Sequence, residues 1–560
     1  MFALTTLLTS SLLAADVRID QVLPENTIAF ASIDDISVLV SHLQTMEMYD
    51  AVFDMASIDR GPWSIPKGQA GWGLYPVVDF ESGTVGVGMF AMLESDDAAF
   101  ATMMKQGFEG YAESNETEIE LIDISGRDVW SVQYDFEFPE DALQLPMDFG
   151  ELSTLYFAHS DGFILFGTEY DGFSKLFSLI DGDASESSLA TNDVYDALMT
   201  RCGTESEVQT GVLLTNFADT FMQMDTSGMG MMILPIVKSI FGDIDGLAQT
   251  MTLAPSEEVI LTCTYAVLME EGRDGLMGLV GAEAPAVDIP LFVADDTIMY
   301  SQNSIDFHRV VSLVKDVTAS NPMLAMQMNS QMIEQMEAGI SMYMSTLGSE
   351  THFMITGSEP YTGDSIGFMM AAECVNEEAL SNVLGMTMPA MGASPTDFLG
   401  NQIFSMDLGA SMMMPMPMDL SFSVAVGGGY VLVGSQFSVE NALRAIANPK
   451  ESRSDHGLNA AASFVSHDIV SGWGYGDMAK VMQMQKAMSM SMDMMNDEMY
   501  AQIEEFDPEM AAEMRAEAEQ GLARQNALLD AMSKMFGPMA WNINADDSGF
   551  TSSIIFMNPK

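Results

Sequence analysis

The chain is poor in cysteine, histidine and basic residues, and each shortage excludes a class of function. Its 560 residues include only 3 cysteines, 6 histidines and 20 lysines and arginines, against 81 aspartates and glutamates, which gives a formal net charge of −61. Nucleic acids and anionic lipid surfaces are bound through clustered Lys and Arg, so we expect no nucleic-acid partner and no peripheral attachment to lipid. An acidic exterior of this kind is typical of a protein that stays soluble in a saline medium.

The three cysteines, Cys202, Cys263 and Cys374, show no C-x-x-C spacing. Structural zinc sites and thioredoxin-like redox sites therefore lack their ligands. In an exported chain Cys202 and Cys263 could form a disulfide, but the sequence does not give the Cα separation that decides it. Cys374 would then be free, and we expect it to be buried in its strand.

The usual catalytic and phosphate-binding motifs are also absent. The sequence contains no H-E-x-x-H, no G-x-S-x-G and no G-x-x-x-x-G-K-S/T. Asp243-Ile244-Asp245-Gly246 matches only a fragment of a calcium loop, and the alternating glycines of Gly472–Gly476 are typical of close backbone packing within a strand. We therefore predict no catalytic residues and no cofactor, with a hydrolase of dispersed site residues as a weaker alternative.

The N-terminal residues 1–15 are apolar and end in Ala14-Ala15. They are fewer than the roughly 20 residues that a membrane-spanning helix needs, and they are typical of a signal peptide with a small-residue cleavage site. No Lys or Arg precedes this run, so a buried first helix is the alternative. No later segment is long and uncharged enough to span a bilayer. We therefore predict export and no integral membrane span.

What the chain does contain is an internal repeat. Val22–Phe30 returns as Leu291–Tyr300, and four further matches follow in the same order. They pair Val85–Phe100 with Ser365–Leu380, Ile124–Ser131 with Phe398–Ser405, Ser160–Thr168 with Gly427–Ser435, and Phe217–Met224 with Met478–Met484. Because order and spacing are kept, we predict two tandem homologous domains, at residues 17–286 and 287–560.

Short glycine turns join several strands within each copy. Leu152–Ala158 and Phe163–Phe166, for example, are separated by a hairpin-type connection, which requires antiparallel pairing. We predict an α+β fold in which each domain is a mixed or antiparallel sheet packed with helices. A long C-terminal helical arm is expected at about 478–535, with a break at Asp507-Pro508 because proline suits the first turn of a new helix.

Methionine, with 53 residues, is the one abundant residue type that could carry chemistry. Five methionines share one face of the predicted arm through spacings of 4, 4, 3 and 4 residues: Met484, Met488, Met492, Met495 and Met499. Thioether sulfurs favour Cu(I), so a periplasmic copper-binding protein is the alternative function. The competing interpretation is that methionine replaces leucine as core filler, since it is spread over most of the chain.

The start of each copy, Asn26-Thr27-Ile28 or Asp296-Thr297-Ile298 followed closely by an aromatic residue, resembles the domain-of-unknown-function family 3352, as do the glycine hairpins downstream. The resemblance covers most of both copies, although Ala294 stands at the position of Pro24. It implies a secreted or envelope-anchored bacterial protein, periplasmic or extracellular, without established catalytic residues. We therefore expect an exported, acidic, non-catalytic binding or structural component of the cell envelope. Its possible partners are an envelope protein or a polysaccharide.

Overall fold

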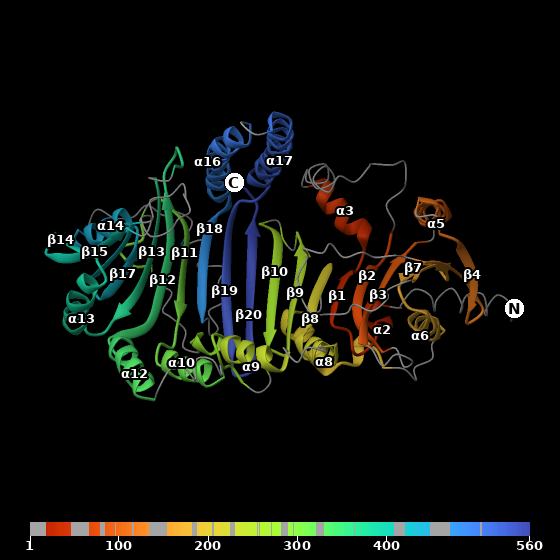
Figure 1. Ribbon diagram of the computed structural model, residues 1–560, viewed down its shortest axis with the longest axis horizontal. Coiled ribbons are helices and arrows are strands. Elements are labelled where there is room, and N and C mark those ends of the chain that lie inside the picture. The colour runs from red at the N-terminus through yellow and green to blue at the C-terminus, as the bar shows by residue number, and fades with distance from the viewer. Residues whose placement is uncertain are drawn as a thin grey trace.

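The computed structural model describes residues 18–559, apart from gaps at 46–66, 79–84, 96, 115–116, 134–153, 182–186, 204–205, 225–229, 255, 257, 270–271, 282–288, 295, 321–329, 363–364, 408–420, 449–457, 459–470 and 505–506. The predicted signal peptide lies outside the described residues. Within them, a single open sheet of 20 strands is flanked by 13 α-helices (Figure 1). The predicted α+β class is confirmed, and the sheet is antiparallel rather than mixed.

Ten strands of the sheet come from each half of the chain. The first half contributes β1 (Ala29–Ile33), β2 (Ala70–Val78), β3 (Val85–Glu94), β4 (Ile119–Ile124), β5 (Arg127–Gln133), β6 (Thr154–Ser160), β7 (Phe163–Gly167), β8 (Val208–Leu213), β9 (Gly246–Leu253) and β10 (Val259–Leu268). The second half contributes β11 (Thr297–Ser304), β12 (Leu347–Gly357), β13 (Ile366–Cys374), β14 (Ser394–Phe398), β15 (Asn401–Asp407), β16 (Ser421–Gly427), β17 (Tyr430–Gly434), β18 (Gly472–Asp477), β19 (Pro538–Asp546) and β20 (Gly549–Met557).

Hydrogen bonding arranges both sets of strands in the same spatial order. The first half runs β4-β5-β6-β7-β3-β2-β1-β8-β9-β10. The second half runs β14-β15-β16-β17-β13-β12-β11-β18-β19-β20. Strands β10 and β20 pair with each other, with Cys263 opposite Ile554, and so join the halves. One sheet therefore continues across the predicted domain boundary.

The helices cover the sheet and its ends. In the first half they are α2 (Ile19–Val22), α3 (Ile36–Thr45), α5 (Ala98–Ser114), α6 (Tyr170–Ile180), α7 (Asp193–Cys202), α8 (Leu214–Met224) and α9 (Gly230–Phe241). In the second half they are α10 (Arg309–Ser320), α12 (Ser330–Met344), α13 (Glu377–Ala390), α14 (Gln436–Ala447), α16 (Met478–Glu504) and α17 (Pro508–Met535). Figure 1 shows α8, α9, α10 and α12 at one end of the central strands, and α16 and α17 at the other.

Two-residue turns close equivalent hairpins in the two halves. Both central residues of each turn have positive φ, the type I′ geometry that matches the twist of paired strands. The φ values are 55° and 81° in Ser125-Gly126, 54° and 83° in Asp161-Gly162, 52° and 83° in Leu399-Gly400, and 64° and 85° in Gly428-Gly429. The hairpins predicted from the glycine turns are thus present, with the second one closing at Asp161-Gly162.

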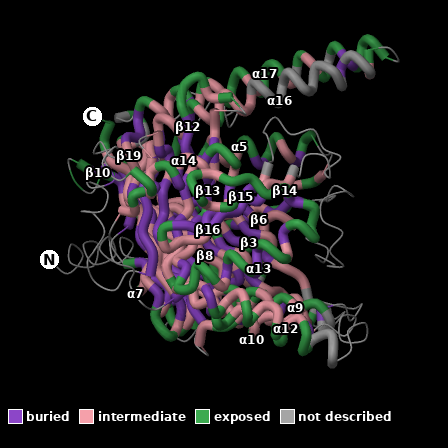
Figure 2. Tube along the Cα trace, turned by 90° about the vertical axis from the view of Figure 1, so that its left-hand side faces the viewer, coloured by how far each residue is buried: buried purple, intermediate pink, exposed green. Residues whose placement is uncertain are grey.

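The C-terminal helical segment folds back on itself rather than forming one rod. It turns between Glu504 and Pro508, where the Asp507 carboxylate accepts a hydrogen bond from the Met510 amide at 3.1 Å. An ion pair of 2.8 Å between Lys486, near the start of α16, and Asp530, near the end of α17, indicates an antiparallel helix pair. Figure 2 shows that this pair extends away from the rest of the molecule.

Three of the apolar cores explain why the sheet holds together. The first half packs around Phe173 and Leu198, and the second half around Tyr300 and Trp473, each side chain buried. The third core lies where the halves meet and combines residues from both: Leu253, Leu261, Cys263, Met478, Met482, Leu529, Met535 and Phe536. Burial of apolar side chains is the main favourable term in folding. The joint is therefore part of the folded core.

Candidate functional site

A cavity of about 400 Å³ lies where the connector between β10 and β11 crosses the start of the second half. One wall is the connector, from Arg273 to Gly281, and the other is formed by Ser304–Arg309 and Leu347–Ser349. Pockets of about 300–1,000 Å³ are the usual size for small-molecule sites. Because its two walls come from residues 273–281 and from residues 304–349, the cavity lies between segments from both sides of the predicted domain boundary.

Backbone hydrogen bonds fix the connector against the end of β11. The Gly281 amide donates to the Ser304 carbonyl, and the Asp306 amide donates to the Leu279 carbonyl, both at 2.8 Å. Val280 and Ile305 form an antiparallel bridge between them. This short ladder holds the two walls at a set distance, so the side chains lining the cavity are positioned by secondary structure.

Arg273 is the less well satisfied of the two arginines in the cavity wall. Its Nη1 donates to the Val280 carbonyl at 2.5 Å, while its Nε is buried and has no hydrogen-bond partner among the described residues. Burial, and then the like charge of Arg309, lower the pKa of Arg273 below the usual value of a guanidinium. A buried donor without a partner costs stability and calls for an explanation, which an acceptor in the cavity would supply.

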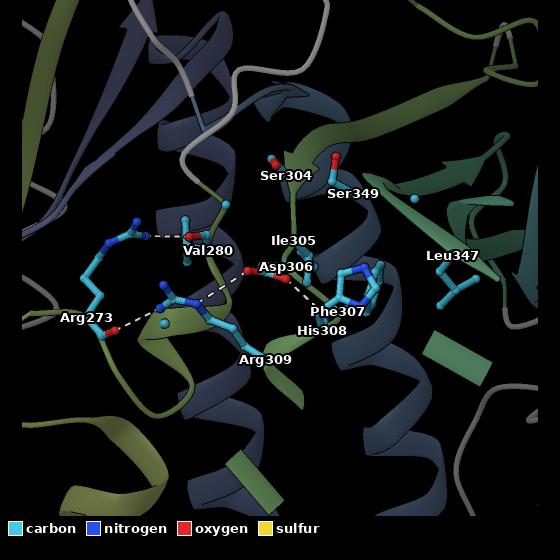
Figure 3. A pocket seen from close by; sticks show the side chains of 13 residues that line it. Arg273, Val280, Ser304, Ile305, Asp306, Phe307, His308, Arg309, Leu347 and Ser349 are labelled. Carbon is cyan, nitrogen blue, oxygen red and sulfur yellow. Dashed lines mark hydrogen bonds and ion pairs between the residues drawn. The ribbon is translucent and has the colours of Figure 1, made fainter. Parts of the chain in front are cut away.

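Arg309 is held beside Arg273 by backbone and carboxylate contacts (Figure 3). Its Nη1 donates to the Arg273 carbonyl at 3.0 Å, and its Nε lies 3.4 Å from the Asp306 carboxylate. A Cβ on Gly278 would lie 3.0 Å from Nη1, so the glycine leaves room for the guanidinium. About half of the Arg309 side chain stays exposed, and it can therefore meet a ligand.

Polar and apolar groups complete the lining. Ser304, Ser349 and His308 supply hydroxyl and imidazole groups, and Figure 3 shows the three on the side of the β11 and β12 segments. Four half-buried apolar side chains also line the cavity: Val280, Ile305, Phe307 and Leu347. The cavity therefore combines cationic donors with an apolar wall.

A second polar cluster lies inside the second half, across β11, β12 and β18. Trp473 Nε1 donates to Gln302 Oε1 at 2.7 Å, and Gln302 Nε2 donates to Glu350 Oε1 at 3.1 Å. His352 connects Glu350 to the Tyr300 hydroxyl, at 2.8 Å from Nε2 and 2.9 Å from Nδ1. The Nε2 contact is short but lies outside hydrogen-bond geometry, so Nε2 has no hydrogen-bond partner among the described residues.

This cluster is a core feature rather than a site open to ligands. Tyr300, Gln302 and Trp473 have no solvent exposure, and His352 has 3%. The contact with His352 lowers the pKa of Glu350 below its usual range. Buried polar groups need partners, and this chain of contacts connects most of them across three adjacent strands.

The five methionines proposed as copper ligands all lie on α16. Met484 and Met488 are half-buried, while the side chains of Met492, Met495 and Met499 lie outside the described residues. Among the described side chains of α16, the buried methionines are instead Met478 and Met482. Since successive helical residues turn by about 100°, Met484 points about 200° away from Met482. The described end of the methionine stripe therefore does not face the third core, where the two halves meet.

Other residues singled out in the sequence have structural surroundings. Cys202, Cys263 and Cys374 are free and buried, so the disulfide left open by the sequence is not formed, and Cys374 ends β13 as predicted. Asp243 forms an ion pair with Lys238 at 2.7 Å. Among the described residues, no group of three or more His, Cys, Asp or Glu side chains could hold a metal ion.

Comparison with known proteins gives no relative from which a role could be transferred. No family model, curated protein or solved structure matches the chain. No helix in the described part of the chain is both long enough and apolar enough to cross a membrane. Function must therefore be argued from the chain's own residues.

Sequence reasoning missed the arginine-lined cavity. Arg273 and Arg309 stand 36 residues apart and belong to no motif. The one available signal was their scarcity, because a chain with so few basic residues has few places where two can meet.

Proposed function

We propose that the protein is an exported, non-catalytic binding component of the bacterial cell envelope, and that the junction cavity is its ligand site. The observation that carries this proposal is the pair of arginines, Arg273 and Arg309, in the wall of a cavity in a chain of net charge −61. Bringing two guanidinium groups together costs energy, and a protein recovers that cost when a ligand binds between them.

The architecture supports the same proposal. The identical strand order of the two halves and their matching I′ turns support two tandem copies of one domain, the second of which ends in the helical arm formed by α16 and α17. The resemblance to the domain-of-unknown-function family 3352 belongs to this proposal. Binding sites often form where two such units meet.

Two experiments test the proposal. N-terminal sequencing of the native protein should find a start after Ala14 or Ala15, and an intact Met1 on cytosolic protein would contradict export. Native mass spectrometry of the gently purified full chain should find a small molecule that is absent from Ser349→Phe, in which the new ring fills the cavity. Ser345→Phe is the matched control, because Ser345 is exposed and does not line the cavity. Equal occupancy of both variants would contradict the proposed site.

A second candidate is Cu(I) binding by the methionines of α16. It is favoured by one observation: Met484 and Met488 are half-exposed and lie on a helix face away from the third core, where the two halves meet. Thioethers are soft donors that suit Cu(I). Anaerobic titration should then show affinity that falls in Met484→Leu/Met488→Leu, since leucine keeps the volume but has no donor atom. Unchanged affinity in a stable double variant would eliminate this candidate.

A further inference from the structure

The charges around the junction cavity limit the kind of ligand that it can take. Two guanidinium groups line it, and the only carboxylate in the described lining, Asp306, is already paired with Arg309. Arg273 is left as the guanidinium without a carboxylate partner in the wall. The cavity therefore has a surplus of about one positive charge.

Further carboxylates prevent a larger surplus. Asp547, and Asp546, which is ion-paired with Arg201 at 3.0 Å, lie close enough to act on the charge of Arg273. The Glu373 carboxylate packs directly against the backbone of Gly348, at the margin of the cavity. A dianion such as phosphate would meet about twice the repulsion from these groups that a monoanion meets. A planar carboxylate also matches the two-pronged donor geometry of a guanidinium.

The rest of the cavity lining includes apolar side chains. Val280, Ile305, Phe307 and Leu347 line it and remain half-exposed, so a ligand that covered them would remove apolar surface from water. Binding pockets typically combine such a wall with a few polar groups that fix the orientation of the ligand. Here the arginines would orient the ligand, and the apolar side chains would contribute burial.

We infer that the ligand of the junction cavity is a small monocarboxylic acid with an apolar body, whose carboxylate lies between Arg273 and Arg309. This inference rests on the proposed function. The bound carboxylate would give the buried Nε of Arg273 its acceptor. It would also connect the β10–β11 connector to the second half, because the two arginines lie on opposite walls.

Isothermal titration calorimetry on the full chain tests the ligand class with three compounds. Benzoate carries the carboxylate and an apolar ring, benzyl alcohol has the same ring without the charge, and inorganic phosphate has charge without the ring. Benzoate should bind at least about 10-fold more tightly than benzyl alcohol, since hydrogen bonds to charged groups contribute more than neutral ones. Phosphate should show no saturable binding.

Variants locate the carboxylate. Arg273→Gln and Arg309→Gln should each weaken benzoate binding by about 10- to 100-fold. Arg444→Gln is the control, because it removes one exposed arginine far along the sheet and changes the net charge equally. If Arg309→Gln unfolds, Arg309→Lys replaces it, and the loss of the two-pronged donor should still weaken binding by about 10-fold.

The outcomes separate the ligand class from the site. Benzoate and benzyl alcohol could bind equally, with binding lost in Ser349→Phe but kept in both glutamine variants. That result would overturn the inference that the ligand is a carboxylate, and would leave the cavity as the binding site. If phosphate binds more tightly than benzoate, the inference that the ligand is a monoanion is overturned. If none of the three compounds shows saturable binding, the inference about the ligand is overturned. Native mass spectrometry of Ser349→Phe would then still test the proposed function independently.

Discussion

Replacing Gly474 with alanine should destabilise the sheet at its centre. Gly474 is buried in β18, between Ser301 of β11 and Trp541 of β19. A Cβ at this position would lie 2.1 Å from Cζ2 and 2.2 Å from Cε2 of the Trp541 ring, far inside van der Waals contact. The rigid ring must move, and overpacking of this kind costs about 1–3 kcal/mol. Reduced freedom of the unfolded chain returns about 0.4–1 kcal/mol.

We therefore expect Gly474→Ala to lose about 1–2 kcal/mol of unfolding free energy, measured by urea denaturation of the full chain with circular dichroism. Gly476→Ala is the matched control in the same strand. Its Cβ would lie 2.7 Å from the terminal Cε of Met539, a flexible methyl group that can turn away. Trp541→Leu should restore much of the loss in the Gly474→Ala background, as a double-mutant cycle would show. Equal stability of the two alanine variants would refute the packing argument.

Three further predictions concern pH, the cysteines and the helix pair. His352 lowers the pKa of Glu350, so this carboxylate contributes stability that is present above its ordinary value of 4.5 and is lost as the pH falls through the lower folded pKa. Urea unfolding across acid pH should therefore show a shallower decline for Glu350→Gln than for the wild type. Burial raises the pKa of Cys202 to about 11 and raises those of the other two thiols, so a thiol reagent should label none in the native protein and all three after denaturation. Asp507→Ala should cost about 1 kcal/mol at the start of α17, seen as faster amide exchange in its first turn but not in the sheet.

The parts of the fold that were predictable from the sequence are those with a local cause. Asp161-Gly162 and Gly428-Gly429 close hairpins because both positions of each turn adopt positive φ, which glycine favours. Pro508 restarts a helix because its ring fixes φ and its missing N–H is not needed in a first turn. These features depend on a few neighbouring residues, so the linear sequence contains the information.

The parts that were not predictable depend on distant segments. The pairing of β10 with β20 joins Cys263 to Ile554, and neither strand carries a pattern that names its partner. The direction of Met484 was equally hidden, because the helical spacing gives a shared face but not what that face contacts. Arg273 and Arg309 meet because the bridge between Val280 and Ile305 brings their segments together, which is a result of tertiary structure alone.

The repeat itself distinguishes a requirement of the fold from a candidate for function. Strands β1 and β11 hold the same place in the two halves. Ala29 lies opposite Val212 of β8 and Met299 lies opposite Gly476 of β18, so Phe30 aligns with Tyr300, as in the sequence repeat. Both copies then start a helix behind an aspartate that accepts backbone hydrogen bonds, Asp35 from Ser37 at 2.7 Å and Asp306 from His308 at 3.1 Å. Counted from that aligned pair, Leu39 takes the position of Arg309. Since the first half folds the same way with a leucine there, the repeated unit does not need an arginine at this position. Arg309 therefore belongs to the junction that only the second half forms, where it donates to the Arg273 carbonyl.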